Sequence, residues 1–222
     1  MTSPPRISKQ MEDYLKNIYK LQAETSPVTT KSISDKMGIS PASVTSMAKK
    51  LGGLNLLAYK RYKGVVLTPT GEKVALEIIR HHRLLELYLT QKVGLEWHKV
   101  DAEAEELEHV LSEEVEAAMD KALGYPTLDP HGDPIPSKDG TMVAPNEVAL
   151  SEFDAGRTSS ITRVLQDDSD ILIYLGEQGI YPDVSISVEE HAPFGGPVTV
   201  SVAGKRIALG RDMAARIFVS KK

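Results

Sequence analysis

Residues 30–54, TKSISDKMGISPASVTSMAKKLGGL, decide the fold of the first part of the chain. A short helix opens around Thr29 and stops at Gly38, and Ser40-Pro41 then supplies the N-cap and first turn of a second helix. A helix, a glycine-containing turn and a second helix with small polar residues at its front form the helix-turn-helix pattern. The stretch therefore predicts a module that places its second helix in the major groove of DNA.

The flanking segments extend this module into a winged form. Upstream, residues 8–24 carry apolar side chains at helical spacing, and Ser26-Pro27 interrupts them. Downstream, residues 56–59 and 65–67 predict two short strands, joined by the basic turn Lys60-Arg61-Tyr62-Lys63-Gly64. We expect a winged helix-turn-helix DNA-binding domain over residues 1–70.

Charge is distributed unevenly along the chain. The whole sequence has a net charge of -5, yet residues 1–70 hold 11 Lys and Arg against 4 Asp and Glu, a net of +7. A basic first third on an acidic protein fits a partner that is DNA. No long Asn, Gln or Arg stands at the front of the second helix, so we expect specificity to depend on DNA shape. The expected DNA contacts are Ser40, Pro41, Ala42, Ser43, Thr45, Ser46, Lys49, Lys50, Lys60, Arg61 and Lys63.

Composition narrows the possible classes of protein. The chain has 222 residues and no cysteine, which excludes disulfides, zinc fingers, iron–sulfur clusters and a thiol nucleophile. No run approaches the roughly 18 apolar residues of a membrane span, so no membrane partner is expected. The first ten residues lack the apolar core of a signal peptide, and we expect a cytoplasmic protein.

Histidines and carboxylates recur at helical spacing in the middle of the chain. His82-x-x-x-Glu86 lies in a predicted helix that begins near Thr68 and continues to about Thr90. Glu105-x-x-Glu108-His109 lies in a second predicted helix, capped by Asp101 and continuing to about Leu123. Residues three and four apart share a helix face, so each group directs its ligands one way. Imidazoles and carboxylates without thiolate favour a hard or borderline divalent ion such as Mn²⁺ or Fe²⁺.

The two predicted helices also carry more apolar surface than one helix pair needs to bury. We expect the surplus to form a homodimer interface, because operator readers of this kind bind as two-fold dimers. His81, His98 and His191 are not part of these matched groups on the two helices and are expected at the surface. Residues 71–147 are thus expected to form a helical dimerisation and metal-binding domain with a linker.

The pattern of apolar and polar residues changes in the last third of the chain. Residues 124–147 are rich in Pro, Gly and Asp and predict the linker. From residue 148 the sequence alternates at strand period, with Asp170 to Gln178 as the only predicted helix. We expect a small β-barrel domain over residues 148–222, which makes the fold mainly α with a small β domain.

In this order, the motifs resemble the diphtheria-toxin-repressor family of metal-dependent regulators, and in particular its manganese-sensing branch with a C-terminal SH3-like (FeoA-like) barrel. The resemblance covers essentially the whole chain. It rests on residues 11–14 (MEDY), 67–71 (LTPTG), 82–86 (HRLLE), 108–110 (EHV) and 129–136 (DPHGDPIP).

The resemblance implies a primary, activating metal site made of Asp13, His82, Glu105, Glu108 and His109. The iron-sensing branch has Met at the position of Asp13 and Cys at that of Glu105, so oxygen replaces sulfur twice and tilts the preference toward Mn²⁺. The bacillus-type manganese regulator has Glu where this chain has Lys16, so its binuclear arrangement is not expected. A second site is implied at Glu86, Asp129 and His131, completed by an acid of the barrel, Asp168 or its neighbour Asp167.

The motifs predict a Mn²⁺-activated homodimer that binds double-stranded operator DNA and is not an enzyme, and the resemblance implies that it represses manganese uptake genes. An Fe²⁺-responsive regulator of the same build is the nearest alternative, because Fe²⁺ also accepts imidazole and carboxylate. A metal-dependent hydrolase and a metal-independent winged-helix regulator are the remaining alternatives. The sequence contains no nucleophile motif or phosphate loop that would favour the hydrolase.

Overall fold

The computed structural model describes residues 7–60, 62–165 and 168–221. The chain divides into two compact units. The first comprises residues up to 81 together with 108–110 and 136–141, and the second comprises 82–107, 111–135 and 142–222. Among the described residues, no helix combines the length and apolarity needed to cross a membrane.

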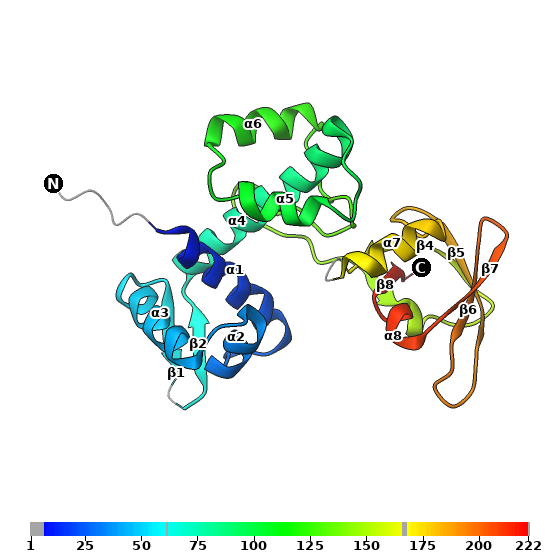
Figure 1. Cartoon of the computed structure of the whole chain (residues 1–222), viewed down its shortest axis with the longest axis horizontal. Helices are drawn as coiled ribbons and strands as arrows, with labels where there is room; N and C mark the ends of the chain where they lie inside the picture. The colour runs from blue at the N-terminus through cyan, green and yellow to red at the C-terminus, as the bar shows by residue number, and fades with distance from the viewer. Residues whose placement is uncertain (1–6, 61, 166–167, 222) are drawn as a thin grey trace. The chain divides into compact units, whose positions relative to one another are not determined.

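Three helices and a two-stranded hairpin begin the first unit (Figure 1). The helices are α1 (Lys9–Glu24), α2 (Thr30–Met37) and α3 (Pro41–Gly53), and the strands are β1 (Leu57–Lys60) and β2 (Gly64–Leu67). The predicted caps are present: the Thr29 side chain accepts from the Ser32 amide and the Ser40 side chain from the Ser43 amide. Gly38 ends α2 with a φ of +65°. The expected winged helix-turn-helix is therefore confirmed.

One apolar core holds these elements together. Tyr14, Leu15 and Ile18 of α1 are almost fully buried, as are Val44 and Leu51 of α3. β1 and β2 pair antiparallel. Burying such side chains stabilises a domain by about 1.5–3 kcal/mol each.

The middle of the chain is helical but less regular than predicted. Helix α4 (Pro69–Tyr88) is followed by a π-helical turn (Leu89–Val93), so the α-helix ends two residues before the expected Thr90. The single helix predicted from Asp101 to about Leu123 is wrong: α5 (Val100–Leu107) and α6 (Glu113–Ala122) are separate. The Ser112 side chain caps α6 by accepting from the Val115 amide, which starts a new helix.

The C-terminal β domain is a six-stranded antiparallel sheet in the order β3-β8-β4-β5-β6-β7. Its strands are β3 (Glu147–Ala149), β4 (Thr158–Val164), β5 (Ser185–His191), β6 (Val198–Val202), β7 (Lys205–Leu209) and β8 (Ile217–Ser220). The predicted helix is α7 (Ser169–Glu177). A short helix α8 (Arg211–Ala214) and a 3-10 turn (Leu150–Glu152) were not expected. The apolar side chains of the alternating strands form a core of their own, which Trp97 joins from the helical segment.

Candidate metal centre

Three predicted ligands meet within the first unit. The Nε2 atom of His109 lies 2.8 Å from Asp13 Oδ1 and 3.2 Å from Glu108 Oε1. One ligand atom from each of the three residues lies within 4.8 Å of the others. Asp13 comes from the first turns of α1, and its side chain is 23% exposed, against 0% for Glu108 and 4% for His109. Two carboxylates and an imidazole that converge in a nearly closed site can hold a divalent cation.

The spacing predicted that Glu105, Glu108 and His109 share one helix face, but Glu108 and His109 lie outside the helix. Helix α5 ends at Leu107, and both residues lie in the turn that leads to α6. His81, expected at the surface, is buried at 7% exposure, and its Nδ1 atom lies 3.2 Å from the carbonyl oxygen of Glu108. The two ligands are thus positioned by a turn packed against α4.

Two further side chains touch this cluster without having been predicted. His109 Nδ1 lies 2.6 Å from Glu12 Oε2, so both nitrogens of the ring face carboxylates. A carboxylate on the far nitrogen of a metal-binding histidine fixes its tautomer and orientation. The ammonium of Lys16, whose side chain is 3% exposed, forms an ion pair with Glu108 Oε1. Sequence reasoning missed these contacts because they join segments more than 90 residues apart.

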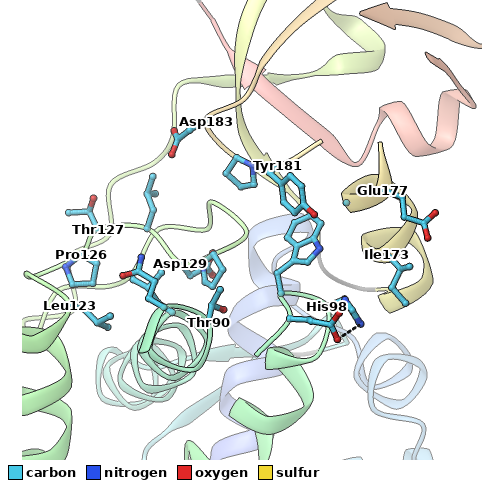
Figure 2. Close-up of a pocket in the computed structure, with 18 residues that line it drawn as sticks. Thr90, His98, Leu123, Pro126, Thr127, Asp129, Ile173, Glu177, Tyr181 and Asp183 are labelled. Atoms are coloured by element: carbon cyan, nitrogen blue, oxygen red, sulfur yellow. Dashed lines mark ion pairs between the residues drawn. The ribbon is translucent and has the colours of Figure 1, made fainter. Parts of the chain in front are cut away.

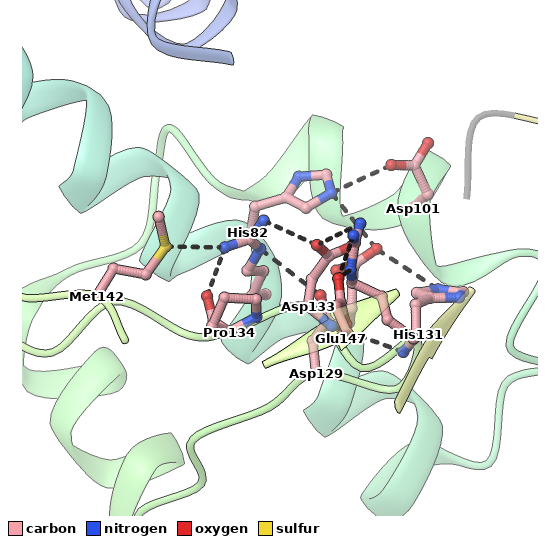
Figure 3. A network of polar contacts seen from close by, with 11 residues as sticks. His82, Asp101, Asp129, His131, Asp133, Pro134, Met142 and Glu147 are labelled. Carbon is pink, nitrogen blue, oxygen red and sulfur yellow. Dashed lines mark hydrogen bonds and ion pairs between the residues drawn. The ribbon is translucent and has the colours of Figure 1, made fainter. Parts of the chain in front are cut away.

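A second cluster lies within the second unit, around His82 and Glu86 of α4 (Figure 3). His82 Nε2 is 3.5 Å from Glu86 Oε1 and 3.2 Å from Asp101 Oδ1, and its Nδ1 is 3.7 Å from Glu105 Oε2. Glu86 is fully buried, and neither of its oxygens has a hydrogen-bond partner within the described ranges. A buried carboxylate without donors is costly unless a cation balances it. The cluster is therefore a candidate cation site.

Asp101 was interpreted only as a helix cap, yet its side chain reaches His82. It lies in the first turn of α5, one turn before Glu105. The i, i+4 spacing of the two acids was the signal that could have revealed it, since such residues share a helix face.

The linker contributes His131 to the same cluster. Its Nε2 atom lies 3.8 Å from Glu86 Oε1, and neither ring nitrogen has a hydrogen-bond partner among the described residues. Burial lowers the pKa of His131 below its ordinary value of 6.5, and this keeps the ring neutral and able to bind a metal. The indole of Trp97 stacks on this ring, with centroids 5.3 Å apart and planes inclined by 23°.

Asp129, predicted as a metal ligand, also stabilises the turn of the linker. Its Oδ1 atom accepts backbone N–H groups of His131 and Asp133 at 2.8 and 2.9 Å, which makes a tight turn. Its Oδ2 atom is buried without a hydrogen-bond partner among the described residues and lies 3.6 Å from Arg83 Nε. Burial first, and then the nearby Glu86 carboxylate, raise the pKa of Asp129 well above its usual range.

The turn is held on both sides by arginines. Arg83 donates to the carbonyl oxygen of Pro134 and lies 3.4 Å from Asp133, while Arg163 of β4 pairs with Asp133 and Glu147 (Figure 3). Gly132 sits within this turn at a φ of +89°. A Cβ atom there would lie 2.0 Å from the Thr162 carbonyl oxygen, so the linker approaches β4 too closely for a side chain.

Asp168, the barrel acid predicted to complete the second site, is not part of this cluster. Asp168 is exposed and caps α7, accepting the backbone N–H groups of Asp170 and Ile171. Its carboxylate is in none of the groups that could hold a metal within the described part of the chain. Asp167 lies outside the described residues.

A cleft of about 920 Å³ adjoins the linker in the second unit (Figure 2). Trp97, Tyr181, the linker around Pro126 and one side of α7 line it. Of the predicted ligands that the structure describes, Asp129 alone lines the cleft. The other predicted ligands that the structure describes are not among its lining residues.

The predicted DNA-contacting residues that the structure describes are all exposed. On α3, Val44, Met47 and Leu51 are buried, and every residue predicted to contact DNA from Ser40 to Lys50 is exposed. Lys60 and Lys63 are exposed at the wing, and Arg61 lies outside the described residues. Tyr62, at the tip of the wing, is 91% exposed and was not predicted.

Three family descriptions match consecutive parts of the chain. "Iron dependent repressor, N-terminal DNA binding domain" matches residues 6–65, "Iron dependent repressor, metal binding and dimerisation domain" matches residues 68–137, and "FeoA domain" matches residues 148–221. The iron-dependent repressor IdeR of Mycobacterium tuberculosis is 32% identical over 95% of this chain and 96% of its own length. This chain belongs to the iron-dependent repressor family.

Other members of the iron-dependent repressor family show the same extent of similarity. The diphtheria toxin repressor of Corynebacterium diphtheriae is 29% identical over 95% of this chain and 96% of its own length. A solved manganese-dependent transcriptional repressor in complex with manganese is 34% identical, with a TM-score of 0.85 over 95% of this chain and 99% of its own. ScaR with bound Cd²⁺ is 33% identical, with a TM-score of 0.81 over 96% and 99% of the two chains.

Family membership decides between the broad alternatives. The chain is a metal-dependent DNA-binding transcriptional repressor with a dimerisation domain and a C-terminal FeoA domain. The hydrolase and the metal-independent regulator are therefore wrong, and the expected fold class is confirmed. Similar identity to iron-dependent and to manganese-dependent repressors leaves the metal open.

Proposed function

We propose that this repressor is activated by Mn²⁺ in preference to Fe²⁺. The observation that carries the proposal is the meeting of Asp13, Glu108 and His109, in which oxygen and imidazole nitrogen are the only ligand atoms. Mn²⁺ stands at the weak end of the divalent affinity order, so selectivity for it relies on hard oxygen ligands. The two positions at which the iron-sensing branch carries sulfur are Asp13 and Glu105 in this chain.

The primary centre consists, in this proposal, of Asp13, Glu105, Glu108, His109 and His82. When bound, the ion neutralises the carboxylates. Asp13 belongs to α1 of the DNA-binding domain, and Glu108 and His109 belong to the turn after α5. An ion held by both segments favours the arrangement in which they lie together. In this proposal that arrangement binds DNA more tightly, so metal raises the affinity for DNA. By linkage, DNA must raise the affinity for metal by the same factor.

The second centre consists, in this proposal, of Glu86, His131 and Asp129, with Asp101 as an added candidate and Asp168 as the barrel acid first expected. Support comes from the buried Glu86 and His131 side chains, which lack hydrogen-bond donors and acceptors among the described residues. Because the linker supplies His131, a cation here stabilises the linker turn on α4.

DNA binding is assigned to the exposed face of α3 and to the wing, in a cytoplasmic homodimer that represses manganese uptake genes. A small groove is lined by Tyr88, Glu114, Val115, Ala118, Met119 and Ala122, and Val115 is 48% exposed. The match to a metal binding and dimerisation domain over residues 68–137 supports the homodimer. The domains are taken as residues 1–70, 71–147 and 148–222.

Metal titration of DNA binding tests the proposal. A duplex is first selected from a random library with the full-length protein and Mn²⁺, and its binding is then titrated with Mn²⁺ or Fe²⁺ without oxygen. We expect DNA binding to be activated at a lower free concentration of Mn²⁺ than of Fe²⁺, and to be lost in excess chelator. The affinity for DNA should fall by orders of magnitude between low and moderate salt. Tight binding in chelator would contradict the metal-sensor reading.

The Fe²⁺-responsive alternative keeps one specific support, the 32% identity to IdeR of Mycobacterium tuberculosis over nearly the whole chain. The same titration separates the two. Activation at lower free Fe²⁺ than Mn²⁺ would favour the alternative.

A further inference from the structure

A lysine lies at the centre of the acidic cluster of the first unit. Lys16 is one helical turn beyond Asp13 on α1, and its side chain is 3% exposed. Lysine is almost never fully buried unless it is paired. Its ammonium contacts Glu108 Oε1, and Glu108 is itself fully buried. The protein thus places an ammonium group where it also gathers metal-binding groups.

The contacted oxygen is the one that faces the proposed ligand nitrogen. Glu108 Oε1 is 3.2 Å from His109 Nε2, and that nitrogen is 2.8 Å from Asp13 Oδ1. A divalent ion bound by these atoms would therefore lie within a few ångströms of the ammonium. At such distances in a partly desolvated site, repulsion between the two positive charges is large.

The same ammonium stabilises the Glu108 carboxylate when no metal is bound. Without it, Glu108 would be a buried carboxylate beside Asp13 and near Glu12, with like charges facing one another. Removing one partner of a buried ion pair strongly destabilises a fold. Lys16 therefore balances the site when no ion is bound and opposes the ion when one arrives.

We propose that Lys16 is the resident counter-charge of Glu108: it holds this carboxylate in the metal-free protein and sets the metal affinity by repelling the ion. The inference rests on the proposed function, because it takes Glu108 as a ligand. A sensor must release its ion when the free concentration falls, and a fixed positive charge in the site raises the concentration at which the ion is half bound.

Substitution of Lys16 in the full-length protein tests this. Lys16→Gln removes the charge but keeps an N–H donor for Glu108, and Lys16→Arg keeps the charge. Lys20→Gln is the matched control, since Lys20 is exposed one turn further along α1. Mn²⁺ affinity is measured by competition with a fluorescent chelator. We expect Lys16→Gln to bind Mn²⁺ at least about tenfold more tightly, and the other two variants to stay within about threefold of wild type.

Thermal unfolding supplies the second readout. We expect Lys16→Gln to unfold at a lower temperature than wild type without metal, and the difference to narrow at saturating Mn²⁺. If the variant does not fold without metal, it is refolded with Mn²⁺, and the chelator concentration that extracts half of the metal is compared. Extraction at the same or lower chelator than wild type overturns the proposal.

Glu108→Gln separates this failure from failure of the proposed metal centre. If Glu108→Gln binds Mn²⁺ as wild type does, Glu108 is not a ligand and both proposals fall. If Glu108→Gln loses affinity while Lys16→Gln is unchanged or weaker, the metal centre stands and the role of Lys16 is overturned.

Discussion

We expect the Glu86→Met variant to be more stable than wild type without metal, and wild type to be the more stable of the two when metal is bound. Glu86 is fully buried, and within the described part of the chain its two oxygens have no hydrogen-bond donor. A buried polar group left without partners costs about 1–3 kcal/mol, and more when charged. Methionine has similar length and no such cost, so Glu86→Met should raise the metal-free unfolding free energy by about 1–3 kcal/mol.

With metal, the wild type should regain the advantage. A site at about 1,000 times its dissociation constant stabilises the folded state by about 4.1 kcal/mol, and the variant lacks that increment at the second centre. Urea unfolding with and without Mn²⁺ measures both quantities, and Glu77→Met, at an exposed position of α4, is the matched control. A metal-free Glu86→Met protein less stable than wild type, with an unchanged metal increment, would refute the reasoning.

Three further outcomes follow from the assigned centres. Asp13→Ala should lower Mn²⁺ affinity by at least about tenfold and abolish metal-dependent DNA binding in a gel-shift assay, while His131→Ala should give a smaller loss that added Mn²⁺ partly rescues; the opposite ranking would exchange the two centres. Glu105→Cys should shift the ratio of Mn²⁺ to Ni²⁺ affinity toward Ni²⁺ by roughly tenfold, and an unchanged ratio in calorimetry would remove Glu105 from the ligands. Because burial lowers the pKa of His131, the unfolded chain takes up this proton first, so metal-free stability should fall as pH drops through 6.5 toward the folded pKa. Urea unfolding between pH 8 and 5 should show this slope reduced in His131→Gln, and equal slopes would contradict it.

The parts of the fold that depend on neighbouring residues could be predicted from the sequence. Thr29, Ser40 and Gly38 act on helices that start or stop beside them, so the helix-turn-helix followed directly. The break before α6 had a local signal too, since Ser112 precedes three acidic residues of the first turn. The regular spacing from Glu105 to His109 concealed it, because a short turn can imitate helical periodicity.

The site was predicted less completely, for a different reason. Residue types and spacing identify Glu86 as a candidate ligand, and the family resemblance adds Asp13 and His131, but neither reveals the side chains that meet them in space. Lys16 reaches Glu108 across 92 positions of sequence. Such pairings are fixed by packing, and a single sequence contains no direct record of them.

The glycine of the linker turn has a consequence for genetics. Every substitution at Gly132 must push the chain away from Thr162, and the adjacent His131 moves with it. A screen for strains that keep the repressed genes switched on despite ample metal should thus recover changes at residue 132 alongside changes at the ligands. Such alleles would be losses of sensing at a codon that encodes no metal-binding group, and any replacement amino acid would produce them.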